Sequence, residues 1–328
     1  MIGGMSKEIQ IQKEIESGPK NVIISGPTSM IGSRFLELAN HKFFGIDVNK
    51  ANSDLKIASS ELDFIKADQD QILTTLSGHE GEVLIHFASF TDVDQAETQR
   101  GDKDGACWQL NVEGTRKLVA AAKNLGLKMV YVSTDFVFDG TKGPYAEVDQ
   151  PAKSANEISW YGWTKLVGEQ VIQNSGIEFL IVRTSYPYRA KFGPKTDFVR
   201  NIIARLRNGN LYPVFCDQFL TPTLIDNFSQ ALNLLLQQNL EGIFHLVDNT
   251  TLTPFEAAIE IAKIFALDEK QIKPAKLQEF YQQNPKMARR PKLGGLRNDK
   301  INRALENYRF SMMDFDQALK VMKSQIEN

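Results

Sequence analysis

The strongest constraint on the fold is a regular alternation of short apolar runs with amphipathic segments, which begins at residue 22 and continues to about residue 185. The runs are rich in β-branched and aromatic residues, which favour buried strands, and the segments between them carry apolar residues at helical spacing. The runs that predict strands are 22–25, 43–47, 83–87, 128–133, 179–183 and 244–247, and the segments that predict helices include 33–40, 111–124 and 160–173. Because strands that alternate with helices pair in parallel and are covered on both faces, the sequence predicts an α/β fold with a doubly wound parallel sheet.

After Tyr186 this alternation becomes irregular. Stretches rich in Pro, Gly and polar residues interrupt short helices, yet 244–247 again has the pattern of a sheet strand. We therefore expect a smaller α/β lobe that is interleaved with the sheet. The expected division is a polar N-terminal extension at 1–20, a larger domain at 21–185 to which 222–250 returns, and a lobe at 186–221 and 251–328. Near the end, an apolar stripe at helical spacing predicts core packing by Met312, Phe315, Leu319, Met322 and Ile326.

Composition excludes several classes of function. The 328 residues include 38 Lys and Arg against 40 Asp and Glu. The resulting net charge of -2 lacks the excess of positive charge that is typical of nucleic-acid-binding proteins. No stretch reaches the roughly 18 apolar residues of a membrane helix, and the N-terminus lacks the apolar segment of a signal peptide. Cys107 and Cys216 are too few for a disulfide framework or a zinc site. We therefore expect a cytoplasmic enzyme without nucleic-acid or membrane partners.

The first predicted strand runs directly into a glycine-bearing turn and then into a helix. Such a turn lets the backbone approach a pyrophosphate, and the helix N-terminus adds free N–H groups and positive potential. Gly26 and Gly32 occupy the outer positions of a Gly-x-x-Gly-x-x-Gly pattern, whereas Ser29 stands at the middle position. The turn predicts a Rossmann-type dinucleotide site that also includes Met30 and Ile31. A helix entry without a ligand is the alternative.

Acidic residues further along the chain bear on the choice of cofactor. Asp47 follows Gly26 by 21 residues, at the end of the second predicted strand, where a carboxylate can accept hydrogen bonds from a ribose diol. An Asp at that position repels a 2′-phosphate and slightly favours NAD(H) over NADP(H), although Lys50 is close enough in sequence to offset the repulsion. A capping or solvent-facing Asp47 is the alternative. We also place Asp68 among the expected cofactor-binding residues.

A tyrosine and a lysine carry the chemistry expected of the site. Tyr161 and Lys165 are four residues apart at the start of a predicted helix, so their side chains lie on one face. A phenol with its ordinary pKa of about 10 is a poor acid–base catalyst at neutral pH, and a neighbouring ammonium lowers that pKa. The Ser133-Thr134-Asp135 block, at the end of a strand predicted to be central, offers a hydroxyl that can hold a substrate carbonyl against Tyr161. From spacing alone, a surface Tyr/Lys pair is the alternative.

Several blocks, in the right order, resemble those of the dTDP-4-dehydrorhamnose reductases, a branch of the extended short-chain dehydrogenases/reductases. The resemblance covers about residues 20 to 310. The blocks are TDVDQAE at 91–97, NVEGT at 111–115, STDFVFDG at 133–140, the Tyr161/Lys165 pair followed by Gly168 and Glu169, RTS at 183–185, PT at 222–223 and RRP at 289–291. The Ser-Thr-Asp and Arg-Pro blocks are specific to this branch, whereas the Tyr/Lys pair marks only the superfamily.

This resemblance implies a catalytic triad of Thr134, Tyr161 and Lys165. Tyr161 would protonate the C4 oxygen as hydride arrives from the nicotinamide, while Lys165 would bind the nicotinamide ribose and lower the pKa of Tyr161. The other implied residues are Ala88, Ser89, Thr91 and Asn111 around the cofactor, and Thr134, Asp135, Ser185, Tyr186 and Arg290 around the substrate. A guanidinium suits a nucleotide diphosphate, and a solvated basic pair with Arg289 is the alternative for Arg290.

The chain departs from the family pattern at three positions. Ser29 replaces the middle glycine of the turn. Arg34 stands where many members have an acidic residue that some use in a metal-bridged dimer, so we expect no metal, and a homodimer of another kind stays open. Tyr186 replaces the usual tryptophan, which leaves the pocket open to a different sugar.

The function implied by the resemblance is NAD(P)H-dependent reduction of the C4 keto group of a nucleoside-diphosphate 4-keto-6-deoxy sugar. An epimerase or dehydratase of the same fold is one alternative. Dehydratases usually add an acidic pair beside the active-site hydroxyl, and here Phe136 follows Asp135, which favours simple reduction. A second alternative is a non-catalytic regulatory subunit similar to the β subunit of methionine adenosyltransferase, against which the intact Thr134, Tyr161 and Lys165 argue.

Overall fold

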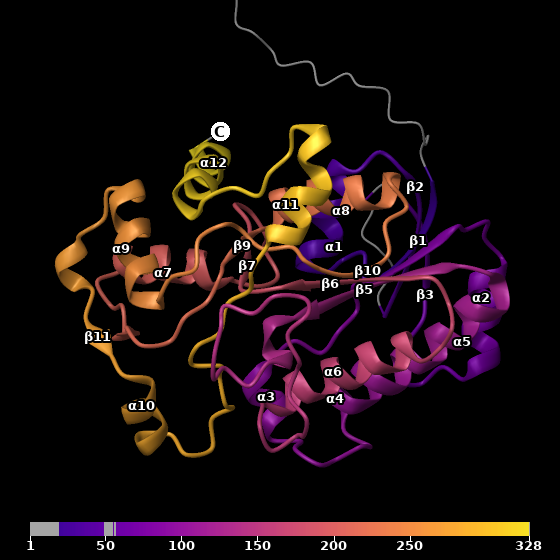
Figure 1. Cartoon of the computed structure of the whole chain (residues 1–328), viewed down its shortest axis with the longest axis horizontal. Coiled ribbons are helices and arrows are strands. Elements are labelled where there is room, and N and C mark those ends of the chain that lie inside the picture. The colour runs from indigo at the N-terminus through magenta and orange to yellow at the C-terminus, as the bar shows by residue number, and fades with distance from the viewer. Residues whose placement is uncertain (1–19, 49–54, 56, 328) are drawn as a thin grey trace, which may run out of the picture.

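Seven parallel strands form the central sheet of the computed structural model, which describes residues 20–48, 55 and 57–327 (Figure 1). Lys50 and the expected extension up to residue 19 lie outside these residues. In spatial order the strands are β10 (Gly242–His245), β6 (Phe179–Thr184), β5 (Lys128–Thr134), β4 (Val83–His86), β1 (Asn21–Ser25), β2 (Lys42–Asp47) and β3 (Ala58–Glu61). The order reverses between β1 and β4, where doubly wound sheets bind ligands at the carboxyl ends of their strands.

Alternating side chains along each strand supply two hydrophobic cores, one on each face of the sheet. Val22 and Ile24 of β1 pack on one face with α1 (Met30–Leu38), α8 (Ile225–Gln237) and α11 (Asp299–Leu305), and Ile23 packs on the other. Three further helices cover that second face, namely α2 (Gln69–Ser77), α5 (Thr115–Leu125) and α6 (Trp160–Gln173) (Figure 1). The strands are thus buried on both sides, which confirms the predicted α/β fold with a doubly wound, Rossmann-type sheet.

A third core lies in the smaller lobe beside one end of the sheet (Figure 1). It is built chiefly by α7 (Phe198–Arg207), α9 (Pro254–Phe265) and α12 (Phe315–Glu327). Two short parallel pairs accompany these helices: β7 (Pro187–Tyr188) with β9 (Thr223–Leu224), and β8 (Val214–Phe215) with β11 (Pro274–Ala275). The predicted stripe on α12 is core packing, because Phe315, Leu319 and Met322 are buried in this cluster.

The remaining helical segments are short and join these layers. They are α3 (Val93–Glu97), α4 (Ala106–Trp108), the π-helical turn η2 (Gln109–Gly114), η3 (Asp135–Val137), η4 (Glu269–Gln271), α10 (Leu277–Gln283) and η5 (Glu306–Tyr308). No helix in the described part of the chain is both long and apolar enough to cross a membrane.

The chain crosses between the sheet and the lobe more often than the sequence suggests. The predicted strand at 244–247 does return to the sheet, because β10 pairs in parallel with β6. However, α11 also returns, with Ile301 and Leu305 buried in the core that α1 and α8 form on the sheet. Part of the expected lobe segment 251–328 therefore packs on the sheet. The division into two domains stays a prediction.

Candidate active site

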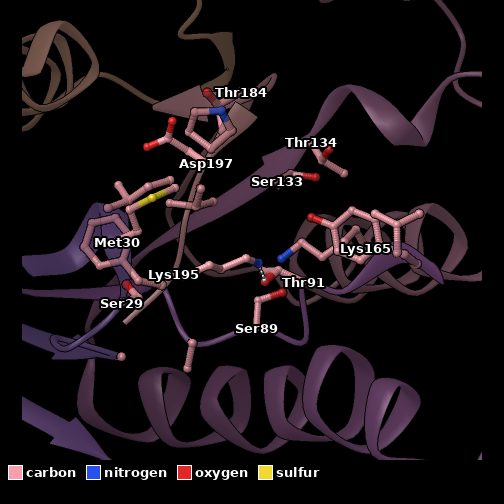
Figure 2. A pocket seen from close by; sticks show the side chains of 18 of the residues that line it. Ser29, Met30, Ser89, Thr91, Ser133, Thr134, Lys165, Thr184, Lys195 and Asp197 are labelled. Atoms are coloured by element: carbon pink, nitrogen blue, oxygen red, sulfur yellow. Dashed lines mark hydrogen bonds between the residues drawn. The ribbon is translucent and has the colours of Figure 1, made fainter. Parts of the chain in front are cut away.

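A cavity of about 650 Å³ lies at the carboxyl edge of the sheet, between the strands and the lobe (Figure 2). Its walls come from the ends of β1, β2, β4, β5 and β6 and from the lobe segment between β7 and α7. The predicted residues that line it are Gly26, Ser29, Met30, Ile31, Asp47, Ala88, Ser89, Thr91, Thr134, Asp135, Tyr161, Lys165, Tyr186 and Arg290. Residues far apart in sequence thus converge on one hollow, where a bound ligand would be surrounded on several sides.

The backbone of the glycine-bearing turn is packed too tightly for a side chain at Gly26 or Gly32. Gly26 has a φ of +71°, and a Cβ there would lie 2.6 Å from the backbone nitrogen of Ala88. At Gly32 a Cβ would lie 2.5 Å from the carbonyl oxygen of Gly26. Ser29 is the N-cap of α1, and its Oγ accepts a hydrogen bond from Gly32 N at 3.1 Å. The replaced middle glycine therefore has a structural role, because Ser29 satisfies one free N–H of the helix terminus.

Asp47 ends β2 beside this turn and is nearly buried. Its carboxylate accepts hydrogen bonds from Thr28 N at 3.2 Å, Thr28 Oγ1 at 2.6 Å and Val48 N at 2.8 Å. These donors hold the carboxylate at the rim of the cavity. Asp68 lies elsewhere: its side chain caps α2 and accepts a hydrogen bond from Gln71 N at 2.8 Å. The local capping box explains Asp68, and the nearby residue that lines the cavity is Phe64.

Helix α6 carries Tyr161 and Lys165 into the cavity from its first two turns. Gly162 allows the close approach, because a Cβ there would lie 2.1 Å from the carbonyl oxygen of Phe136. Burial raises the pKa of the Tyr161 phenol, and the hydroxyl of Thr134 only partly offsets this effect. Burial also lowers the pKa of Lys165 to about 7, although the Glu169 carboxylate opposes the shift.

The expected lowering of the Tyr161 pKa by Lys165 is therefore wrong, because burial raises this pKa instead. The lysine is itself desolvated, so its ammonium carries less charge at neutral pH, and the phenolate is desolvated as well. Tyr161 is consequently a protonated phenol at neutral pH. This is the form that can donate a proton to a developing alkoxide.

Thr134 and Asp135 end β5 next to these side chains. Thr134 Oγ1 donates a hydrogen bond to Asp135 Oδ1 at 3.0 Å, and Ser185 Oγ donates to Asp135 Oδ2 at 2.7 Å. Burial raises the pKa of the Asp135 carboxyl to about 6, and these two hydroxyl groups moderate the shift. Ser185 does not reach the cavity wall and instead fixes the position of Asp135.

Asn111 also stands behind the wall of the cavity. Its Oδ1 accepts hydrogen bonds from Ser89 Oγ at 2.9 Å and Phe90 N at 2.8 Å, and its Nδ2 donates to Thr164 Oγ1 at 3.0 Å. Asn111 lies in the π-helical turn η2, and it ties the loop after β4 to α6. It therefore supports the cavity without lining it.

Lobe residues complete the other side of the cavity. Arg290 Nη2 pairs with Asp94 Oδ2 at 2.8 Å and keeps its position at the wall. Arg289 is different, because its guanidinium contacts the carbonyl oxygens of Asn156 and Glu157 near the surface. Tyr186 has a φ of +43°, an uncommon conformation for a bulky residue, and its ring lines the cavity.

Several residues that line the cavity are not among the predicted site residues. Ser133 Oγ is buried and has no hydrogen-bond partner among the described residues, so it is free to bind a ligand. Phe192, Lys195 and Asp197 come from the lobe segment before α7, which carries no recognisable motif. Among the described residues, no cluster of three or more His, Cys, Asp or Glu side chains is placed to hold a metal ion.

Arg34, which stands where many family members have an acidic residue, does not line the cavity. Its Nε and Nη2 donate to the two carboxylate oxygens of Asp226 at 2.8 and 2.6 Å. This bidentate pair joins α1 to α8 within one chain.

The strand order, the glycine turn and the Tyr161/Lys165 pair define a Rossmann-fold protein of the short-chain dehydrogenase/reductase class. The chain belongs to the RmlD substrate binding domain family, whose model matches residues 20–327. The resemblance seen in the sequence blocks is thereby confirmed.

Individual relatives agree with this assignment. A dTDP-4-dehydrorhamnose reductase of Mycobacterium tuberculosis is 27% identical over 275 residues, which are 81% of this chain and 83% of the relative. A probable low-salt glycan biosynthesis reductase, Agl14 of Haloferax volcanii, is 29% identical over 61% of this chain, and the match spans 65% of that protein. The β subunit of methionine adenosyltransferase 2 from Bos taurus is 24% identical over 80% of this chain and 78% of its own length.

A solved structure shows the same fold. The dTDP-4-dehydrorhamnose reductase of Bacillus anthracis, in complex with NADP, superimposes with a TM-score of 0.77 at 26% identity. The alignment covers 94% of this chain and all of that chain.

Proposed function

We propose that the protein uses a nicotinamide dinucleotide to reduce the C4 keto group of a nucleoside-diphosphate 4-keto-6-deoxy sugar. The observation that carries this proposal is a single cavity lined by the glycine turn and by Thr134, Tyr161 and Lys165. The family and the reductases related to this chain support the same reaction.

The residues present fit a dinucleotide. Only glycine fits at position 26, where the turn has a positive φ and packs against the backbone of Ala88, and this turn leads into the N-terminus of α1, whose free N–H groups would suit a pyrophosphate. Asp47 lies at the rim, where it would accept hydrogen bonds from the adenosine ribose. When bound, the dinucleotide supplies the hydride.

The chain's own residues would handle the proton and the orientation of the substrate. Tyr161 is protonated at neutral pH and would donate its proton to the C4 oxygen as negative charge develops there. Thr134 would orient the same oxygen, and Lys165, buried beneath the cavity, would bind the nicotinamide ribose. Asp135 and Tyr186 would contact the sugar, and Arg290 would contact its diphosphate.

Turnover tests the proposal directly. Oxidation of NADH and NADPH is measured against a panel of nucleotide 4-keto-6-deoxy sugars, and at least one sugar is expected to be reduced. The similarity to the β subunit of methionine adenosyltransferase 2 favours a second candidate, a non-catalytic subunit. Recovery of a stoichiometric partner enzyme, together with no turnover of any keto sugar, would reject the reductase in favour of that subunit.

Cofactor preference provides a separate prediction. The Asp47→Ala variant is expected to bind NADP+ about tenfold more tightly relative to NAD+, because it loses the carboxylate that repels a 2′-phosphate. Asp47→Asn removes the charge but keeps the shape that Thr28 holds, so it serves as the matched variant. The measurement is the ratio of the two dissociation constants, and an unchanged ratio in both variants would remove Asp47 from the ribose site.

A further inference from the structure

Lys195 crosses the candidate cavity from the lobe to the sheet. It lies between β7 and α7, and its Nζ donates a hydrogen bond at 3.2 Å to Thr91 Oγ1, which belongs to the loop after β4 (Figure 2). Both residues line the cavity, although they are 104 positions apart in sequence. In Figure 2 the side chains of Lys195 and Lys165 extend toward Thr91 from opposite sides of the hollow.

The charges around Lys195 leave its ammonium without a counter-ion. The nearby guanidinium groups of Arg189, Arg200 and Arg290 are paired with Glu37, Asp197 and Asp94, respectively. Neither Lys195 nor Lys165 forms a salt bridge with any residue that the structure describes. The one carboxylate contributed by the same lobe segment, Asp197, is already neutralised by Arg200 Nε at 2.6 Å. An anion that entered the cavity would therefore meet unpaired positive charge.

The backbone that carries Lys195 is fixed next to the N-terminus of α1. Arg200 donates to the carbonyl oxygens of Phe192 at 2.6 Å and of Lys195 at 2.5 Å. Arg189 donates to the carbonyl oxygen of Met30 at 3.2 Å and to Ser33 Oγ at 2.9 Å. The long side chain of Lys195 can therefore swing while its Cα stays beside the turn that would hold a phosphate.

We propose that Lys195 binds the diphosphate of a nucleotide in this cavity, exchanging its hydrogen bond to Thr91 for one to a phosphate oxygen. A lobe residue would then contact a phosphate group bound at the carboxyl edge of the sheet, and ligand binding would tie the lobe to the sheet. The diphosphate has two sources, the dinucleotide and the sugar nucleotide. This inference rests on the proposed function, because it assumes that one of these ligands occupies the cavity.

The test measures binding rather than turnover. Dissociation constants for NAD+, NADP+ and dTDP are determined by titration calorimetry for the full-length wild type, Lys195→Met, Lys195→Arg and Lys191→Met. Lys191 is exposed on the same segment and does not line the cavity, so it is the matched control. Lys195→Met is expected to weaken binding of the phosphate-bearing ligand about tenfold, as for a partly solvated charge-assisted hydrogen bond.

Three further results are expected. Lys195→Arg retains most of the affinity, Lys191→Met behaves as the wild type, and the affinity of Lys195→Met depends less steeply on salt concentration. A loss confined to NAD+ and NADP+ identifies the cofactor diphosphate as the contact, and a loss confined to dTDP identifies the substrate diphosphate. Equal affinities of Lys195→Met and the wild type for all three ligands would overturn the inference and leave the proposed function intact. Failure of the wild type to bind any of them would overturn both.

Discussion

The Tyr161→Phe variant is expected to lose reductase activity by about 10²- to 10⁴-fold in kcat, the usual contribution of a positioned general acid. The phenol is buried in the cavity and its pKa is raised, so at neutral pH it carries the proton that the C4 oxygen requires. Removing the hydroxyl leaves the ring, and with it the packing against Phe136. Binding of the dinucleotide should therefore remain close to that of the wild type, which separates proton donation from a general loss of structure.

A second tyrosine serves as the control for this substitution. Tyr212 is half exposed in the lobe, where its hydroxyl accepts a hydrogen bond from Asn201 Nδ2, and it does not line the cavity. Tyr212→Phe should turn over as the wild type does. Steady-state and single-turnover measurements on the same sugar decide the matter. Equal kcat values for Tyr161→Phe and the wild type would show that the proton comes from another group.

The second large effect concerns stability. Arg183 on β6 and Glu169 on α6 form a bidentate ion pair with distances of 2.9 and 2.6 Å, and both side chains are almost fully buried. Glu169→Met leaves the guanidinium buried without its counter-ion, so the free energy of unfolding is expected to fall by about 3–5 kcal/mol. Because α6 also carries Tyr161 and Lys165, the variant should lose cofactor affinity before it unfolds completely.

Urea unfolding with a surface pair as control tests this expectation. Arg297 and Asp299 form an ion pair in which both side chains are more than half exposed, and Asp299→Asn should cost no more than about 1 kcal/mol. A double variant, Arg183→Met with Glu169→Met, should recover part of the loss, because it no longer buries an unpaired charge. If Glu169→Met were as stable as Asp299→Asn, the pair would not anchor α6 to the sheet.

The sequence predicted the central sheet well, because six of its strands carry uninterrupted apolar runs. The exception is β3, whose residues Ala58–Glu61 are small and polar and lie at the edge of the sheet. Such a strand is defined by its hydrogen bonds to β2, and no hydrophobic pattern marks it. Helix α6 was predicted at its observed bounds, since the spacing of its apolar residues is a local signal.

The candidate site was predicted only where residues belong to local motifs. Gly26, Thr134, Tyr161 and Lys165 stand in short patterns with a chemical rationale, and all four line the cavity. Asp68 caps α2 and does not line the cavity, so its expected role at the cofactor stays a prediction. Lys195 could not be found, since its relation to Thr91 arises only when the lobe folds over the sheet.

The crossings between the sheet and the lobe also govern the order in which the chain can fold during synthesis. The core on the α1 and α8 face needs Ile301 and Leu305 of α11, and the lobe core needs Phe315 and Leu319 of α12. Neither hydrophobic core can be completed before these segments have been synthesised, although β1 to β5 leave the ribosome much earlier. The nascent protein is therefore expected to expose apolar strands until these late segments are made, and such exposed surface is prone to aggregation.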